Sequence, residues 1–206
     1  MTIIRLLRLN FIQANIVVLC QAPRSGPAGK PAWSENFRRK PVRSEKEIGK
    51  DKATCRLTAA EIARLPERAN VHQFNANAIR NTRSIGDQLG LSDVGVHLVR
   101  VEPGRETTEH HFHGQDEEFL YILSGRAEAT IGEETFEVGP GDFMAFPKNS
   151  PAHSMRVPAG ASEDLVYLMG GTRTPIDICT YPRLGRRMYR VDGVKEYAAL
   201  DDFKKV

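Results

Sequence analysis

Residues 104–125 read GRETTEHHFHGQDEEFLYILSG, and this stretch carries most of the information about the fold. It joins a polar segment with three histidines to a run of large apolar residues that ends at Gly125. His111 and His113 are two positions apart, so on a β-strand both point to one side of the sheet and His110 to the other. The pattern predicts a strand that presents two imidazoles together.

Glu118 opens the apolar run and shares its predicted face with Leu120 and Ile122, which would face the interior of a barrel. A buried carboxylate is unfavourable unless a positive group meets it, and a metal ion would be such a partner. Glu117 lies on the opposite face. A β-bulge could exchange the two acids, so Glu117 stays a second candidate behind Glu118.

A second histidine segment, residues 141–153, reads GDFMAFPKNSPAH. It would bring His153 from a neighbouring strand to join His111, His113 and Glu118 as a fourth ligand. Three neutral imidazoles and one carboxylate suit Zn, Fe, Mn, Ni or Co, and do not suit Ca or Mg. We therefore predict that these four residues hold one divalent transition metal per chain.

Short apolar segments with a period of two recur along the chain from residue 94 onward, separated by Gly and Pro turns. Such even spacing predicts an antiparallel sandwich or barrel. No sequence between these segments has the pattern of a long helix, which argues against a parallel α/β sheet. The predicted strands cover residues 94–101, 119–123, 127–131, 135–138, 143–146 and 164–169.

A stretch rich in Pro, Gly, Ser and charged residues ends shortly before Thr58, and a segment with a regular apolar pattern follows it. Thr58 and Glu61 have the spacing of a capping box, which predicts a short helix that stops at Pro66. We divide the chain into two parts. Residues 1–53 form a flexible N-terminal arm or a start-site extension, and residues 54–206 form a β-barrel domain whose C-terminal tail wraps the outside.

The composition is that of an ordinary soluble globular protein, with 40% hydrophobic and 27% charged residues in a chain of 206. The formal net charge of +3 is small, and much of the excess lies in residues 24–52, so we expect no nucleic-acid partner. Three scattered cysteines cannot form a closed disulfide framework. They fit a reducing compartment, so we expect a cytoplasmic protein.

The first twenty residues combine basic Arg5 and Arg8 with an apolar run, residues 11–20, that is too short to span a bilayer. Three interpretations fit this segment: a signal peptide, a flexible tail or an upstream start codon. We favour the second and third, which leave the segment outside the fold, and we expect no membrane partner.

The two histidine segments resemble the two sequence motifs of the cupin family. The first motif is a Gly followed by a His-x-His pair, four residues, Glu, six residues and Gly. The residues that fill it are Gly104, His111, His113, Glu118 and Gly125, with one extra residue between Gly104 and His111.

The second cupin motif is Gly-x5-Pro-x-Gly-x2-His-x3-Asn. Gly141 and Pro147 match its first half. Asn149 stands where the second glycine would be, His153 comes one residue late, and Val157 replaces the final asparagine.

Two further runs, residues 167–175 and 181–185, are similar to a bacterial group of single-domain cupins without an established reaction. The resemblance covers about residues 57–191. It implies an all-β fold, a jelly-roll (double-stranded β-helix) cupin barrel with a short N-terminal helix and extended terminal arms, commonly paired into homodimers. It implies no particular substrate, because one scaffold carries many functions.

A divalent ion with one carboxylate ligand leaves one net positive charge in a dry barrel, which favours carboxylates, enediols and enolates. We therefore expect a small anionic ligand. The preferred function is a metal-dependent enzyme that acts on a small oxygen-rich acid or sugar-like substrate by isomerisation, lyase chemistry or dioxygenation. The alternative is a non-catalytic module that binds or senses a small molecule. No general base can be named from the sequence.

Other residues receive simpler interpretations. His72 and His97 have no second ligand nearby and are expected at the surface or in hydrogen bonds. Asp116 is expected in a solvated turn, and Phe143 and Phe146 in the core. Three arginines could reach the barrel mouth and hold an anionic ligand: Arg100, Arg105 and Arg126. We expect at least two of them at the surface instead.

Overall fold

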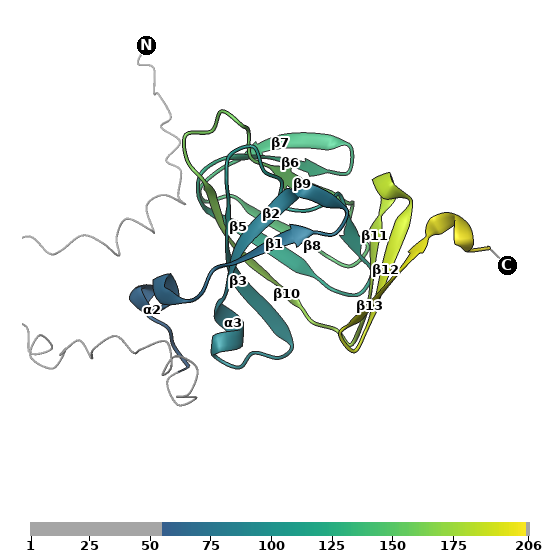
Figure 1. The fold of residues 1–206 in the computed structure, drawn as a ribbon, viewed down its shortest axis with the longest axis horizontal. Coiled ribbons are helices and arrows are strands. Elements are labelled where there is room, and N and C mark those ends of the chain that lie inside the picture. The colour runs from purple at the N-terminus through teal and green to yellow at the C-terminus, as the bar shows by residue number, and fades with distance from the viewer. Residues whose placement is uncertain (1–54, 205–206) are drawn as a thin grey trace, which may run out of the picture. The chain divides into compact units, whose positions relative to one another are not determined.

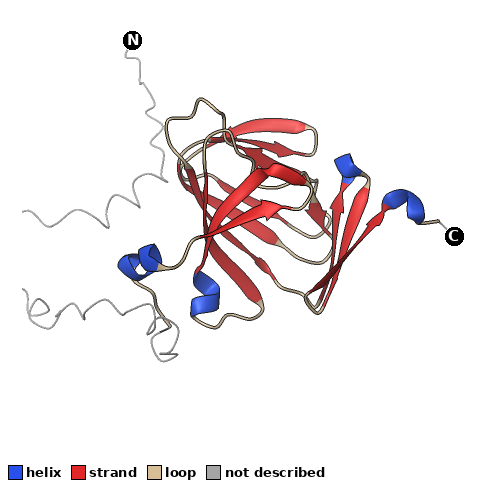
Figure 2. Cartoon of the chain, viewed as in Figure 1, coloured by secondary structure: helices blue, strands red, loops and turns tan. Residues whose placement is uncertain are grey.

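The computed structural model of the protein describes residues 55–204. In this range the chain consists mainly of β-strands in three antiparallel sheets, with a few short helices (Figures 1 and 2). No helix in the described range is long and apolar enough to cross a membrane. The predicted N-terminal arm, residues 1–53, lies outside that range.

The largest sheet has six strands in the order β1-β2-β3-β10-β5-β8. Side chains alternate between its two faces, and Val99, Ile122 and Tyr167 point inward with at most 1% of their surface exposed. The bounds of its strands are β1 Arg68–His72, β2 Asn75–Ser84, β3 Val94–Val101, β5 Glu118–Ser124, β8 Phe143–Phe146 and β10 Leu165–Thr172.

The second sheet has the order β7-β6-β9, with β6 at Ala127–Ile131, β7 at Glu134–Val138 and β9 at His153–Arg156. Its inner residues Ala129 and Met155 belong to the same buried cluster as the inner residues of the six-stranded sheet. The main hydrophobic core therefore lies between these two sheets, as in a β-sandwich.

The third sheet has the order β13-β12-β11-β4. Its two C-terminal strands form a hairpin beside β11 and are yellow in Figure 1. A second buried cluster of Cys179, Tyr181 and Met188 holds this sheet together, with Phe74 packed against it. The bounds are β4 Phe112–His113, β11 Ile176–Tyr181, β12 Arg186–Val191 and β13 Val194–Ala199.

Helix α2, Ala59–Arg64, begins where the sequence predicts it. The backbone N–H of Thr58 donates to the carboxylate of Glu61 at 2.7 Å, and the Glu61 N–H donates to the Thr58 hydroxyl at 3.3 Å. This reciprocal pair is the predicted capping box. The other helical segments are α3 Ile85–Gln88, η1 Pro182–Leu184 and η2 Leu200–Asp202.

The period-two pattern predicted β3, β6 and β8 with their observed bounds. Leu120 and Ile122 are buried, so the predicted inner face of β5 is confirmed. The prediction that Phe143 belongs to the core is wrong, because its side chain is 61% exposed while Phe146 is buried. The two residues are three positions apart on β8, so they point to opposite faces of the sheet.

Candidate metal centre

Two backbone hydrogen bonds join the histidine segments. The His111 N–H donates to the His153 carbonyl at 3.1 Å, and the His153 N–H donates to the His111 carbonyl at 2.8 Å. This antiparallel bridge brings the loop before β4 against the start of β9. The two imidazole centroids lie 4.8 Å apart, so the predicted convergence of the two segments is present.

Glu118 completes a group of three possible ligands with His111 and His153. One donor atom from each of the three lies within 4.8 Å of the other two. Oε2 of Glu118 is 3.2 Å from Nε2 of His153. Both histidines are buried, and the Glu118 side chain is 18% exposed at the end of β5. The acid therefore points at the imidazoles, as the alternation along β5 predicts.

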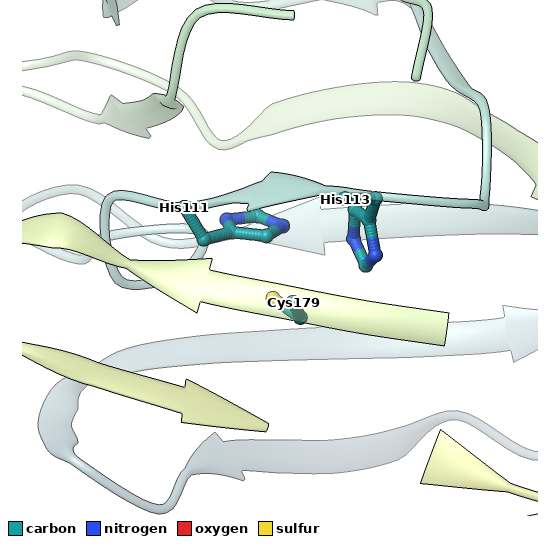
Figure 3. Close-up of side chains that lie close together, drawn as sticks. All are labelled: His111, His113 and Cys179. Carbon is teal, nitrogen blue, oxygen red and sulfur yellow. The ribbon is translucent and has the colours of Figure 1, made fainter. Parts of the chain in front are cut away.

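His113, the fourth predicted ligand, lies beside this group on β4. Its ring centroid is 5.0 Å from that of His111, and the rings are nearly perpendicular. The ligating atoms of His113, His111 and Cys179 form a separate group within the same 4.8 Å limit (Figure 3). The structure thus places three predicted ligands together and His113 at their edge, and metal coordination by all four stays a prediction.

Hydrogen bonds at Nδ1 fix the orientation of two rings. Nδ1 of His111 is 2.9 Å from the backbone oxygen of Glu109, and Nδ1 of His113 is 2.6 Å from Oδ2 of Asp177. An oxygen at Nδ1 favours the tautomer that carries its proton there, which leaves the Nε2 lone pair free. Both imidazoles are therefore prepared to ligate through Nε2.

The protein does not supply a hydrogen-bond partner for every ring nitrogen of His153. Its ring stacks on Phe146 with centroids 3.5 Å apart. Its buried Nδ1 has no hydrogen-bond partner among the described residues. Such a buried nitrogen is rare in folded proteins. Together with a donor set of imidazoles and one carboxylate, it fits a site that binds a transition-metal ion.

The charges of the cluster also suit a cation. Burial opposes ionisation of Glu118, but the hydrogen bond with His153 and the charges of the three nearby histidines outweigh it and lower its pKa to about 2. Burial and the neighbouring His153 lower the pKa of His111 to about 3. At neutral pH the acid is therefore a carboxylate and His111 is neutral, which are the ligating forms.

A small cavity of about 20 Å³ lies next to the cluster, roughly the space for one water molecule. Apolar side chains of the core form about half of its lining. Its walls include Arg80, the only arginine or lysine among the described residues that line it. Its other lining residues include Thr108, Leu120, Met144, Tyr167 and Met169.

Asp177 is a functional candidate that sequence reasoning missed. It is fully buried on β11, and its Oδ1 accepts hydrogen bonds from the backbone N–H groups of Gln115 and Asp116 at 3.0 and 3.1 Å. The signal that singled out Glu118, an acid within an apolar strand, is also present at Asp177. The sequence did not predict residues 176–181 as a strand, so Asp177 was not recognised as an acid within one.

The prediction that Asp116 lies in a solvated turn is wrong. Its side chain is 8% exposed, and its Oδ2 is 2.7 Å from Nη2 of Arg190 on β12. Its Oδ1 also accepts a hydrogen bond from the hydroxyl of Thr174 at 2.6 Å. The C-terminal hairpin supplies this arginine, so the hairpin buries the acidic turn that precedes Glu118.

The remaining predicted residues have structural partners. Nδ1 of His97 is 3.1 Å from the Ser84 hydroxyl, and the ring of His72 packs on Tyr181, so both are hydrogen-bonded or packing residues as expected. The three arginines proposed for the barrel mouth do not line the cavity. They bind other groups, with Arg100 on Glu67 and Asp164, Arg105 on Asn77, and Arg126 on Glu137.

Comparison with known proteins identifies the family. Residues 97–169 match the family model described as the cupin domain. A solved structure from Acidithiobacillus ferrooxidans ATCC 23270, provisionally named a sugar phosphate isomerase, is 38% identical with a TM-score of 0.70. That comparison covers 74% of this chain and 96% of the other.

Two further proteins are similar. A solved sugar phosphate isomerase from a cupin superfamily, from Silicibacter pomeroyi DSS-3, is 26% identical with a TM-score of 0.62 and covers 73% of this chain and 96% of its own. An oxalate decarboxylase from Arthroderma benhamiae is 40% identical over 76 residues, or 34% of this chain. The match spans only 17% of that protein's length. From the domain match and the similarity along nearly all of the first structure, this chain belongs to the cupin superfamily.

Proposed function

We propose that this cupin is a metal-dependent enzyme that acts on a small oxygen-rich acid or sugar-like molecule by isomerisation, lyase chemistry or dioxygenation. One observation carries the proposal. The ligating atoms of His111, Glu118 and His153 converge within 4.8 Å beside a small cavity. A cluster of this chemistry next to a cavity is a common arrangement for a catalytic metal site.

His111, His113, Glu118 and His153 would hold one divalent transition-metal ion. Such an ion supplies Lewis-acid activation of substrate oxygens, and a redox centre if it is iron. The protein contributes a carboxylate that offsets part of the positive charge, and an apolar wall that excludes water. Asp177 keeps the His113 ring oriented through the bond at Nδ1.

The relatives support two branches of this proposal. The two solved structures named as sugar phosphate isomerases match along almost their full length, which supports isomerisation of a sugar-like molecule. The oxalate decarboxylase matches over a shorter segment, which supports lyase chemistry on a small acid. Both reaction types act on substrates with neighbouring oxygen atoms that one metal ion can bind.

Removal and restoration of the metal tests the proposal. The protein is treated with a chelator, reloaded with single metals and assayed against panels of small hydroxy acids, keto acids and sugars. Turnover should vanish without metal and return with it, and Glu118→Gln should lose both metal and turnover. Glu117→Gln, on the opposite face of the chain, should retain them. Turnover that survives complete metal removal contradicts the proposal.

The cavity favours a second candidate function, a non-catalytic module that binds or senses a small molecule. Its volume of about 20 Å³ leaves room for about one water molecule in this conformation. A cavity this small leaves little room for substrate and product together, which suits binding or sensing better than turnover. Saturable binding of a small acid by the metal-loaded protein, without conversion during long incubation, would favour this function.

We further propose that the chain forms a homodimer in the cytoplasm, without nucleic-acid or membrane partners. The family resemblance supports pairing into dimers, and the small net charge of +3 supports the absence of a nucleic-acid partner. Light scattering of the purified full chain tests the assembly, and a monomer mass at micromolar concentration contradicts it.

A further inference from the structure

Arg80 on β2 points into the interior of the domain. Its neighbours on the same face of the strand, Ala78 and Thr82, are 1% and 9% exposed. The arginine side chain reaches across to β10, where its Nη1 lies 3.6 Å from Sδ of Met169. Arg80 lines the same cavity as His111 and Glu118. A guanidinium and the candidate metal ligands therefore line one cavity.

The guanidinium of Arg80 forms no ion pair with any carboxylate in the described part of the chain, and its neighbours there include the Met169 thioether and the Tyr167 phenol. Arg83, three positions along β2, instead pairs with Glu67 at 3.0 Å. Arg80 is only partly buried, but a cation at this depth without a counter-ion is still less stable than one that is paired. The planar guanidinium fork matches the two oxygens of a carboxylate, so a bound acid would satisfy it.

The Tyr167 phenol near Arg80 cannot supply the missing negative charge. Tyr167 is 1% exposed and lines the same cavity. Burial raises the pKa of this phenol well above its usual range, so it keeps its proton at neutral pH. The phenol can take part in hydrogen bonds, but it does not neutralise the arginine. The carboxylate of Glu118 also lines the cavity, but in the proposed site it binds the metal ion, so a bound acid would supply the counter-charge of Arg80.

We propose that Arg80 binds the carboxylate of a small acid whose other oxygens face the metal site. This inference rests on the proposed function and narrows its substrate class to acids, as opposed to neutral sugars. A divalent ion on one carboxylate ligand leaves one net positive charge, and Arg80 adds a second. A ligand with negative charge near both groups balances them.

The size of the cavity argues for a short acid. About 20 Å³ holds one water molecule, so any organic ligand must displace some of the lining side chains, and a larger ligand must displace more. Met144 and Met169 are the lining residues best suited to move, because their unbranched thioether chains adopt several conformations. An acid of a few carbon atoms requires the smallest displacement.

Calorimetric titration of the manganese-loaded full chain tests the assignment with three probes: malonate, glycerol as the neutral three-carbon probe, and inorganic phosphate. The wild type should bind malonate more tightly than phosphate, and should not bind glycerol measurably. Arg80→Met should raise the malonate Kd about 10- to 100-fold, the range for loss of a charge-assisted hydrogen bond. Arg80→Lys keeps the charge but loses the fork, so it should raise the Kd less.

The matched control is Arg126→Met, since Arg126 is 66% exposed and pairs with an exposed glutamate away from the cavity. It should bind malonate as the wild type does. Metal content and melting temperature are measured for every variant, and Arg80→Lys carries the test if Arg80→Met does not fold. An unchanged malonate Kd in metal-loaded, folded Arg80 variants overturns the role of Arg80.

Three other outcomes are also decisive. Glycerol binding as tight as malonate binding overturns the restriction to acids, and tighter binding of phosphate than of malonate overturns the choice of a carboxylate. In both cases the proposed metal-dependent function survives. Failure of the wild-type chain to bind any divalent metal overturns that function, and this inference with it.

Discussion

In the structure, Nδ1 of His113 lies 2.6 Å from Oδ2 of the fully buried Asp177. The other oxygen of the same carboxylate accepts two backbone N–H groups from the turn after His113. One acid therefore fixes both the imidazole and the chain segment that leads to Glu118. Carboxylates that bond a ligating histidine in this way orient its ring and increase its basicity.

Asp177→Asn should weaken metal binding without abolishing it. The amide oxygen can keep the two backbone hydrogen bonds, but the negative charge at Nδ1 of His113 is lost. We expect a loss of about 10- to 100-fold in metal affinity, the usual range for such partners. Competition with a chromophoric chelator measures it. Asp192→Asn, at an exposed turn, is the control, and equal affinities in the two variants would contradict a role for Asp177.

His113→Ala tests the ligand at the edge of the cluster. If His113 ligates, the variant should no longer bind one equivalent of metal, because an incomplete donor set holds the ion weakly. His97→Ala is the control, since His97 bonds to Ser84 and lies outside the grouped ligands. Metal content after gel filtration provides the measurement. A full equivalent retained by His113→Ala would remove His113 from the ligand set.

Metal affinity should fall on the acid side of neutrality. Burial alone would lower the pKa of His113, but the bond to Asp177 and the charge of Glu118 outweigh it and raise the pKa above 6.5. Below that pKa a proton competes with the metal for His113, so affinity is retained at higher pH and lost as pH falls. With one competing proton, the loss is about tenfold per pH unit.

Equilibrium competition titrations between about pH 5 and 8 measure this dependence. In Asp177→Asn the largest influence that raises the pKa of His113 is lost and the charge of Glu118 remains, so the onset of the loss of metal affinity should move to lower pH. His111 should not limit binding in this range, because its pKa is lowered to about 3. Unchanged occupancy down to about pH 4 contradicts a site of three histidines.

Short sequence patterns predicted the features that depend only on residues close together in the chain. The capping box at Thr58 and the inward face of β5 depend on residues a few positions apart, and both are present. The meeting of His111 with His153 depends on distant segments; it was predicted from the chemistry of the two histidine segments, and their resemblance to the two cupin motifs supports it. Spacing within each segment does not determine which strands become neighbours.

The missed features depend on contacts between parts of the chain that are far apart. Asp116 looks like a surface acid in its own segment, and only the hairpin that carries Arg190 buries it. Arg80 lies on β2, which the sequence did not predict as a strand, so its inward orientation was not considered. The arginines that were considered are those near the histidines in sequence, and they bind other residues.

Gly125, the last residue of the first histidine segment, is required by the backbone at the end of β5. Its φ angle is +76°, in the left-handed region where residues with a Cβ are disfavoured. A Cβ at this position would overlap the carbonyl oxygen of Asp164 and lie 2.8 Å from Cα of Leu165. Backbone atoms cannot yield as a flexible side chain does, so β5 and the segment before β10 would have to separate.

Gly125→Ala should therefore lower the free energy of unfolding by more than about 2 kcal/mol, the combined effect of strain and overlap. Gly160→Ala is the matched control, because a Cβ there meets no atom within 4 Å, and its effect should stay within about 0.5 kcal/mol. Urea unfolding followed by circular dichroism measures both. Equal midpoints for the two variants would show that the turn relaxes freely, and the motif glycine would then need another explanation than this close approach.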